Sequence, residues 1–166
     1  MKSKDHAEGK VFFFVDRVSQ KGNNQGCRMK NDVKKRTVFT EVEFGVTEFI
    51  VGQYGGFDKL AARAVIDAKK THPEVILTLL LPYHPAERPI EVPQGFDGTY
   101  YPPDMERVPR RLAIVRANRY MVDHVDYLIA YAWHPASNAR ELVEYAKANV
   151  KILRVTEISR KRDVNI

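Results

Sequence analysis

A pair of glycines between an apolar run and a helical pattern is the part of this chain best suited to bind a ligand. The apolar run covers residues 47–51, and the helical pattern covers 58–70. Glycines let a backbone approach a ligand closely, and the first N–H groups of a helix are unpaired donors that face an anion. The pattern also fits a tight turn that binds nothing. The predicted phosphate-binding loop consists of Gly55, Gly56, Phe57 and Asp58, of which the last caps the helix or binds a ribose hydroxyl.

A second group of polar residues interrupts an otherwise amphipathic helical pattern. Residues 116–123 read Arg-Ala-Asn-Arg-Tyr-Met-Val-Asp. Arg116 could hold a phosphate through two parallel hydrogen bonds, and Asn118 could read a base or a ribose. The alternative is a solvated helix face with ion pairs such as Arg119 to Asp123.

A third group follows the apolar run at 127–131. Ser137 or Asn138 would cap the next helix, which makes this a second possible anion site or simply a helix cap. Glu141 lies in the first two turns of that helix, where the helix dipole favours a carboxylate whether or not it takes part in catalysis.

Metal and cofactor chemistry are not expected. The 5 histidines show no metal-ligand spacing, although His84 and His134 both follow strands and could converge at one sheet edge. Cys27 is the only cysteine, so a cysteine-rich zinc site is impossible. We expect no metal and no resident cofactor, since the chain also lacks a Walker lysine and a GxGxxG motif.

The elements that would position these residues alternate along the chain. Nearly continuous apolar runs are typical of strands buried on both faces of a parallel sheet. Together they predict an α/β fold, a Rossmann-like three-layer sandwich with a mainly parallel sheet. The expected strands cover 11–15, 47–51, 75–81, 127–131 and 151–155, and the expected helices cover 58–70, 109–125 and 138–148.

Two segments fit this alternation poorly. Residues 82–108 are rich in proline and predict a long irregular loop with a short strand near 98–101. Residues 16–35 are polar where a first helix should begin, so that helix is expected at about 31–44. Ligands of open α/β sheets bind at the carboxyl ends of the strands. The site is therefore expected among the loops at 16–20, 53–57, 82–87 and 132–138.

Length and composition suggest one cytoplasmic domain. The 166 residues are enough for one domain with its own core, which we expect to span 1–166 with a polar tail at 1–10 and a basic tail at 156–166. No apolar run approaches the ~20 residues of a membrane span, and the polar start of the chain does not resemble a secretory signal. The single cysteine fits a reducing compartment. We expect no contact with a membrane.

The net charge of +6 is unevenly distributed. Residues 17–36 contain seven basic residues and one acid, and a second basic cluster lies at 160–162. Such clusters can bind nucleic acid, or they can be solvated surface. No aromatic residue lies between Arg17 and Arg36, so the stacking platforms expected for single strands are missing there.

Several segments together resemble the YpsA-like branch of the SLOG superfamily, which also contains the DprA/Smf DNA-processing proteins and the Lonely Guy phosphoribohydrolases. The resemblance implies a Rossmann-like fold and a pocket for a nucleotide or a nucleotide-derived ligand. Lonely Guy enzymes cleave the N-glycosidic bond of nucleoside monophosphates with an arginine and a glutamate. The resemblance rests on 45–52 leading into 56–60, on Tyr101-Pro102, and on 108–114, 118–123 and 126–129.

The chain departs from the family pattern at three corners of the expected pocket. After the first strand the family has Gly-His-Arg, and only Arg17 matches. Ala117 stands where the family has arginine, and a shift of one residue turns Arg116 by ~100° around the helix. Ser137-Asn138 replaces a glycine pair near the enzyme glutamate's position, where Glu141 falls.

These departures favour a binding protein over an enzyme. We expect a nucleotide or nucleotide-derivative binding protein with a regulatory or sensor role and a partly degenerate pocket, in which Arg17, Asn118 and Arg116 hold phosphate or base. One alternative is a nucleoside monophosphate N-glycosidase that uses Glu141. Another is a nucleic-acid-associated protein that acts through the basic segment 17–36. Family analogy also suggests a homodimer.

Overall fold

The computed structural model describes residues 10–15, 45–131, 136–149 and 154–157. The basic segment 17–36 with Arg17, the helix expected at 31–44, His134 and most of both expected tails lie outside the described residues.

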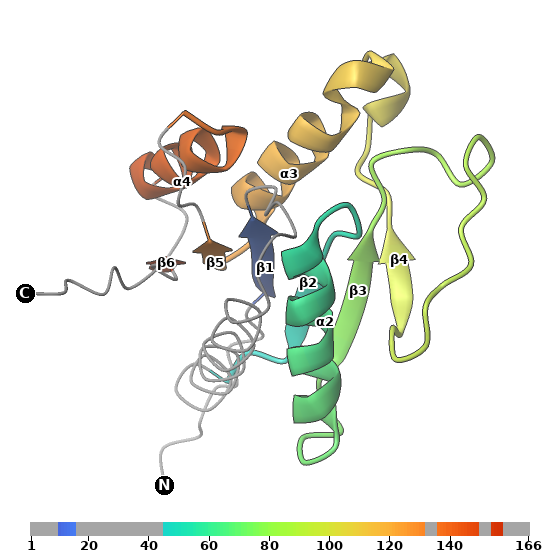
Figure 1. The fold of residues 1–166 in the computed structure, drawn as a ribbon, viewed down its shortest axis with the longest axis vertical. Helices are drawn as coiled ribbons and strands as arrows, with labels where there is room; N and C mark the ends of the chain where they lie inside the picture. Colours follow the sequence, from blue (N-terminus) through green and yellow to red (C-terminus); the bar gives the residue numbers. More distant parts are fainter. Residues whose placement is uncertain (1–9, 16–44, 132–135, 150–153, 158–166) are drawn as a thin grey trace, which may run out of the picture.

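A parallel sheet of six strands forms the centre of the molecule (Figure 1). The strand order is β4-β3-β2-β1-β5-β6, and every neighbouring pair is parallel. In the register, Phe13 pairs with Val51 on one side and with Ile129 on the other. The strands are β1 (Lys10–Val15), β2 (Glu48–Val51), β3 (Ile76–Leu80), β4 (Gly98–Tyr100), β5 (Tyr127–Tyr131) and β6 (Arg154–Glu157).

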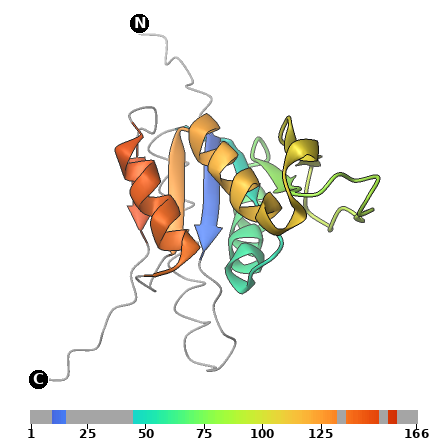
Figure 2. The ribbon, with the colours of Figure 1, turned by 90° about the horizontal axis from the view of Figure 1, so that it is seen from above.

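Helices cover both faces of the sheet, which gives the three layers expected from the sequence (Figures 1 and 2). Helix α2 packs on β1, β2 and β3, whereas α3 and α4 pack on each other and on the opposite face. Among the described residues, no helix is both long and apolar enough to cross a membrane. The helices are α2 (Gly56–Lys69), α3 (Ala113–His124) and α4 (Asn138–Ala148), with short 3-10 helices η1 (Met105–Arg107) and η2 (Arg110–Leu112).

The core consists of two clusters, one on each face of the sheet. Phe49 and Val51 point toward α2, while Ile50 between them packs with α3 and α4. Leu128 and Ile129 divide in the same way on β5. Successive side chains of a strand point to opposite faces, so a sheet covered on both sides needs apolar residues at every position. Full burial of each such side chain contributes roughly 1.5–3 kcal/mol.

The boundaries differ from the expected ones by one or two residues at several elements, and by more at the start of α3. The helix expected over 109–125 begins with the 3-10 turn of η2, and its α-helical part covers 113–124. The last strand, expected over 151–155, is described over Arg154–Glu157, and residues 150–153 lie outside the described residues. The short strand expected near 98–101 is present as β4.

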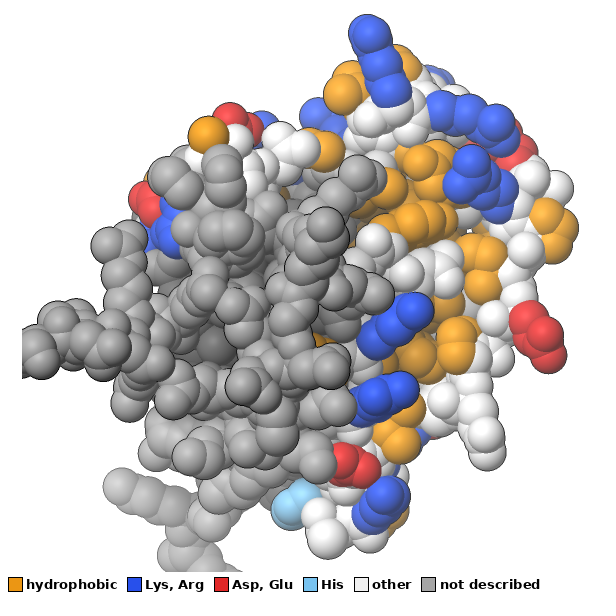
Figure 3. All heavy atoms as spheres, viewed as in Figure 1, with side chains coloured by type: hydrophobic (Ala, Val, Ile, Leu, Met, Phe, Trp, Pro, Cys, Tyr) orange, Lys and Arg blue, Asp and Glu red, His pale blue; other side chains and the backbone are white. Residues whose placement is uncertain are grey.

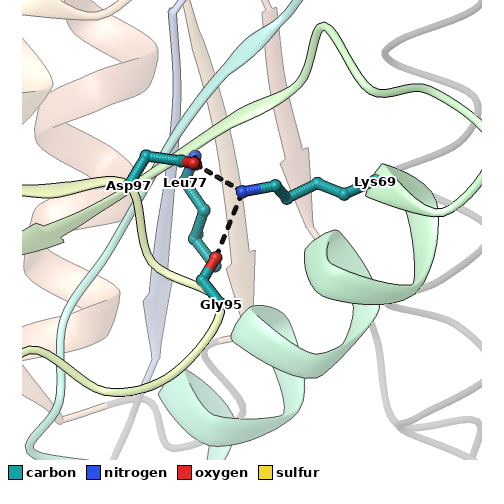
Figure 4. Close-up of polar contacts among 4 residues, drawn as sticks. All are labelled: Lys69, Leu77, Gly95 and Asp97. Carbon is teal, nitrogen blue, oxygen red and sulfur yellow. Dashed lines mark hydrogen bonds and ion pairs between the residues drawn. The ribbon is translucent and has the colours of Figure 1, made fainter.

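A polar clasp fixes the long loop that leads into β4 (Figure 4). Lys69 of α2 donates to the carbonyl of Gly95 at 3.2 Å and to the carboxylate of Asp97. That carboxylate also accepts the Leu77 N–H at 2.7 Å. Partial burial alone would raise the pKa of Asp97, but the Leu77 N–H and Lys69 together lower it below its ordinary value. The clasp therefore ties the loop to both α2 and β3.

Candidate functional site

The carboxyl ends of all six strands meet at one edge of the sheet, where open α/β sheets bind ligands. The order of the strands reverses between β1 and β5, which is the topological switch point of this sheet. The segments that directly follow these two strands, 16–44 and 132–135, are not described. The described part of this edge therefore consists of the loops after β2, β3 and β4 and the start of α4.

The loop after β2 directs its N–H groups at a side chain of the protein itself. The Asp58 carboxylate accepts hydrogen bonds from the N–H groups of Tyr54 and Gly55, both at 3.0 Å. Asp58 thereby caps α2 from its first turn, and Gly55 is the residue before the helix. A β-carbon on Gly52 would lie 3.1 Å from Asp58 Oδ2, so the loop packs closely on this carboxylate. An anion at this place would have to compete with Asp58 for the same donors.

Burial changes the acidity of this carboxyl. Loss of water around Asp58 raises its pKa to about 6, although the N–H bonds from Gly55 and Tyr54 act in the opposite direction. Near neutral pH the loop therefore contains a carboxyl that titrates. Of the other residues in the predicted loop, Gly56 and Phe57 form the first positions of α2.

Helix α3 separates the two residues that were expected to act together. Asn118 is 9% exposed and lies on the buried side of the helix with Ala117, Met121 and Val122. Arg116 is exposed. Two residues along a helix correspond to a turn of about 200°, so Arg116 and Asn118 point to nearly opposite sides. The structure does not bring this pair together.

The Asn118 amide is a buried polar group without a visible partner. Within the described part of the chain, its side chain makes no hydrogen bond. Leaving a buried donor or acceptor unsatisfied costs roughly 1–3 kcal/mol. A buried amide of this kind is a candidate contact for a molecule bound beside α3.

The start of α4 matches the expected helix cap. Ser137 precedes the helix, and its Oγ accepts the N–H of Arg140 at 3.2 Å. Asn138, the first residue of the helix, and Glu141, in its first turn, are both exposed. The described geometry places no arginine beside Glu141 of the kind that an N-glycosidase would need. Among the described residues, no group of three or more histidine, cysteine, aspartate or glutamate side chains could hold a metal ion.

Aromatic and basic side chains form two groups of contacts along this edge that were not predicted. The Tyr54 ring meets the Tyr83 ring edge-on at 6.0 Å between centroids. The Arg88 guanidinium lies 4.3 Å above the Tyr83 ring. The Tyr83 hydroxyl reaches the carbonyl of Arg110 at 3.5 Å, and His84 packs edge-on against Tyr101 at 5.2 Å. We call Tyr54, Tyr83, His84, Arg88, Tyr101 and Arg110 the tyrosine–arginine surface.

The same rule that pointed to the glycine loop could have found these rings. Tyr54 follows β2, Tyr83 and His84 follow β3, and Tyr101 follows β4. Figure 3 shows hydrophobic side chains interspersed with Lys and Arg on the face that carries these loops. The basic segment 17–36 contains no ring, so its charge alone did not point to these stacking residues.

No family model and no curated protein matches this chain. A solved structure resembles it in fold. DNA processing protein A from Helicobacter pylori, described for its single-stranded DNA binding mode, has a TM-score of 0.59 and 14% sequence identity. The match covers 94% of this chain and 67% of that chain. At this identity the likeness establishes the fold alone. It agrees with the Rossmann-like fold that the sequence resemblance implied, and the neighbour belongs to the DNA-processing group named there.

Proposed function

We propose that this protein binds single-stranded nucleic acid across the tyrosine–arginine surface. The observation that carries the proposal is the chain of contacts that joins Tyr54, Tyr83, Arg88 and Arg110 at the carboxyl edge of the sheet. Aromatic rings and guanidinium planes stack on bases regardless of sequence, and arginines neutralise phosphates. The sequence analysis placed nucleic-acid binding in the basic segment 17–36, whereas this proposal places it on the tyrosine–arginine surface. Nucleic-acid binding also agrees with the described activity of the structural neighbour.

On this surface, a phosphate could replace the carboxylate that pairs with Arg110. Arg110 Nη2 lies 3.5 Å from Glu87 Oε2, and both side chains are more than 60% exposed. Such exposed pairs contribute little, about 0–1 kcal/mol, so a phosphate can replace the carboxylate at small cost. Arg88 is exposed and stacks on the Tyr83 ring, and no acid among the described residues pairs with it.

Fluorescence anisotropy with a labelled 20-nucleotide single strand tests the proposal. Tyr54 is 40% exposed, so its ring can be removed with little effect on the core. Because a stacked base contributes about 1–3 kcal/mol, Tyr54→Ala should weaken binding about fivefold or more. Tyr54→Phe, which keeps the ring, is the matched control. Equal affinity of the alanine variant and the wild type would contradict the proposal.

A second candidate function is the binding of a nucleotide-type small molecule beside α3. The observation that favours it is the buried Asn118 amide, which has no hydrogen-bond partner within the described residues. This function is the nucleotide binding expected from the sequence, with Asn118 rather than Arg116 as the contact on α3. It is also the function that the resemblance to YpsA-like proteins implies. A thermal-shift screen with nucleoside monophosphates tests it. A stabilising ligand whose effect disappears in Asn118→Leu would support this function, and the absence of any shift would count against it.

A further inference from the structure

The solvent side of η2 and of the first turns of α3 combines apolar side chains with arginines. Arg111, Leu112, Val115, Arg116 and Arg119 are all exposed and follow one another at helical spacing. We call these five residues the α3 outer face. Over the start of α3, at the top of Figure 3, Lys and Arg side chains lie beside hydrophobic ones.

The exposed apolar residues of this face are not needed for the core. The opposite side of α3 supplies Ala113, Ala117 and Met121 to the buried cluster. Leu112 is 47% exposed and Val115 is 43% exposed. The other large hydrophobic side chains that are exposed in the described residues belong to separate elements, so only here do two of them lie within one turn of a helix.

The charges of the face all have the same sign. The segment 107–122 contains five arginines and no acidic residue. Within the described residues, no carboxylate pairs with Arg111 or Arg116. Arg119 is held in place, because its guanidinium lies 4.1 Å above the Tyr145 ring. The nearest acid along the helix, Asp123, accepts hydrogen bonds from Tyr145 and from Asn149 on the side of α4.

We propose that the α3 outer face binds an acidic amphipathic segment of a partner protein. Carboxylates of such a segment would pair with the arginines, and its apolar side chains would cover Leu112 and Val115. A nucleic acid strand would satisfy the arginines and leave the two aliphatic side chains in water. A second copy of this chain in a symmetric contact would bring arginines against arginines. The α3 outer face adjoins the tyrosine–arginine surface, because Arg110 and Arg111 are neighbours in η2, but the two surfaces share no residue.

Fluorescence anisotropy of the full chain with a designed peptide tests this proposal. The probe is an 18-residue helical peptide with leucines along one face and glutamates on both sides of them, and a scrambled peptide of the same composition is the reference. We expect the patterned peptide to bind at least tenfold more tightly than the scrambled one. The double variant Leu112→Ser, Val115→Ser should lose at least tenfold in affinity, and Arg111→Gln, Arg116→Gln should lower both the affinity and its salt dependence.

Val92→Ser is the matched control, because Val92 is also 43% exposed but lies in the loop before β4. It should bind the patterned peptide as the wild type does. Each of four results would overturn the proposal: no binding of the patterned peptide, equal binding of the scrambled one, weaker oligonucleotide binding by Leu112→Ser, Val115→Ser, or a dimer in sedimentation that this double variant abolishes. Oligonucleotide binding by the serine variant should equal that of the wild type, which separates this test from that of the proposed function.

Discussion

At the residue scale, two effects act in opposite directions on the pKa of Asp58: hydrogen bonds lower it and burial raises it. Its carboxylate receives two N–H groups, while burial raises its pKa from 3.8 to about 6. In the unfolded chain the proton leaves near pH 4, so between about pH 4 and 6 the folded state binds more protons. The free energy of unfolding therefore falls as the pH rises through this window, by at most about 3 kcal/mol.

Asp58→Asn should remove this pH dependence, because the amide oxygen can still accept both N–H groups and carries no charge. Urea unfolding at pH 4, 5, 6 and 7 measures it. The stability of the variant relative to the wild type should increase with pH. Asp104→Asn, at an exposed site, is the control and should follow the wild type. Parallel pH profiles for Asp58→Asn and the wild type would show that burial does not govern this carboxyl.

Asn118 gives a second prediction at this scale. Leucine has a similar volume and no polar atoms, so Asn118→Leu removes a buried amide that makes no hydrogen bond within the described residues. The ligand-free variant should be as stable as the wild type or more stable by about 1–3 kcal/mol. Thermal unfolding measures the difference. A loss of stability would mean that the amide is satisfied in the folded protein.

Single residues also show which parts of the candidate site could be predicted from the sequence. Gly55 and Gly56 indicated the start of α2, and Asp58 was expected either to cap the helix or to bind a ribose. Which of the two it does depends on whether the Asp58 side chain folds back over the preceding backbone. No pattern of residue types determines that conformation. Asn118 stood out by its type, but its burial could not be predicted, because it depends on which side of α3 faces the sheet.

At the element scale, the clasp at the start of β4 depends on a glycine. Gly95 has φ +96°, and a β-carbon there would lie 2.6 Å from Ile66 Cδ1 on α2. Gly95→Ala should therefore add both backbone strain and a steric clash, with a loss of about 2–4 kcal/mol. Gly45→Ala is the matched control, since φ is +63° there and a β-carbon would meet no atom within 4 Å. Gly45→Ala should cost about 1–2 kcal/mol, from the strain alone.

Urea unfolding of both variants measures the difference. Equal losses would mean that Ile66 moves aside without cost and that the loop does not depend on this contact. The elements themselves were largely predictable, because a strand covered on both faces is mostly apolar, as β5 is throughout and β2 is from Phe49 to Val51. The contact of Tyr54 with Tyr83 was not, since it requires the adjacency of β2 and β3, which residue types alone do not specify.

At the scale of the whole molecule, the fold was predicted and the strand order was not. The alternation of strands and helices implies a parallel sheet, but the reversal between β1 and β5 results from the path of the chain. The parallel direction of β2, β3 and β4 places the loops that follow them, with the rings and the arginines of the tyrosine–arginine surface, at one edge. The net charge of +6 then acts on any polyanion that approaches this edge.

The salt dependence of binding separates the contribution of the arginines on the tyrosine–arginine surface from that of the net charge. Each arginine that neutralises a phosphate of a single strand releases a counterion and contributes about 0.7 to the slope of log affinity against log salt. Arg88→Gln and Arg110→Gln should each reduce the slope by about that amount. Arg63→Gln removes the same charge from an exposed position on α2 and should leave the slope unchanged. Anisotropy titrations between 50 and 300 mM salt measure all three variants. If all three reduced the slope equally, the net charge and not the tyrosine–arginine surface would hold the strand.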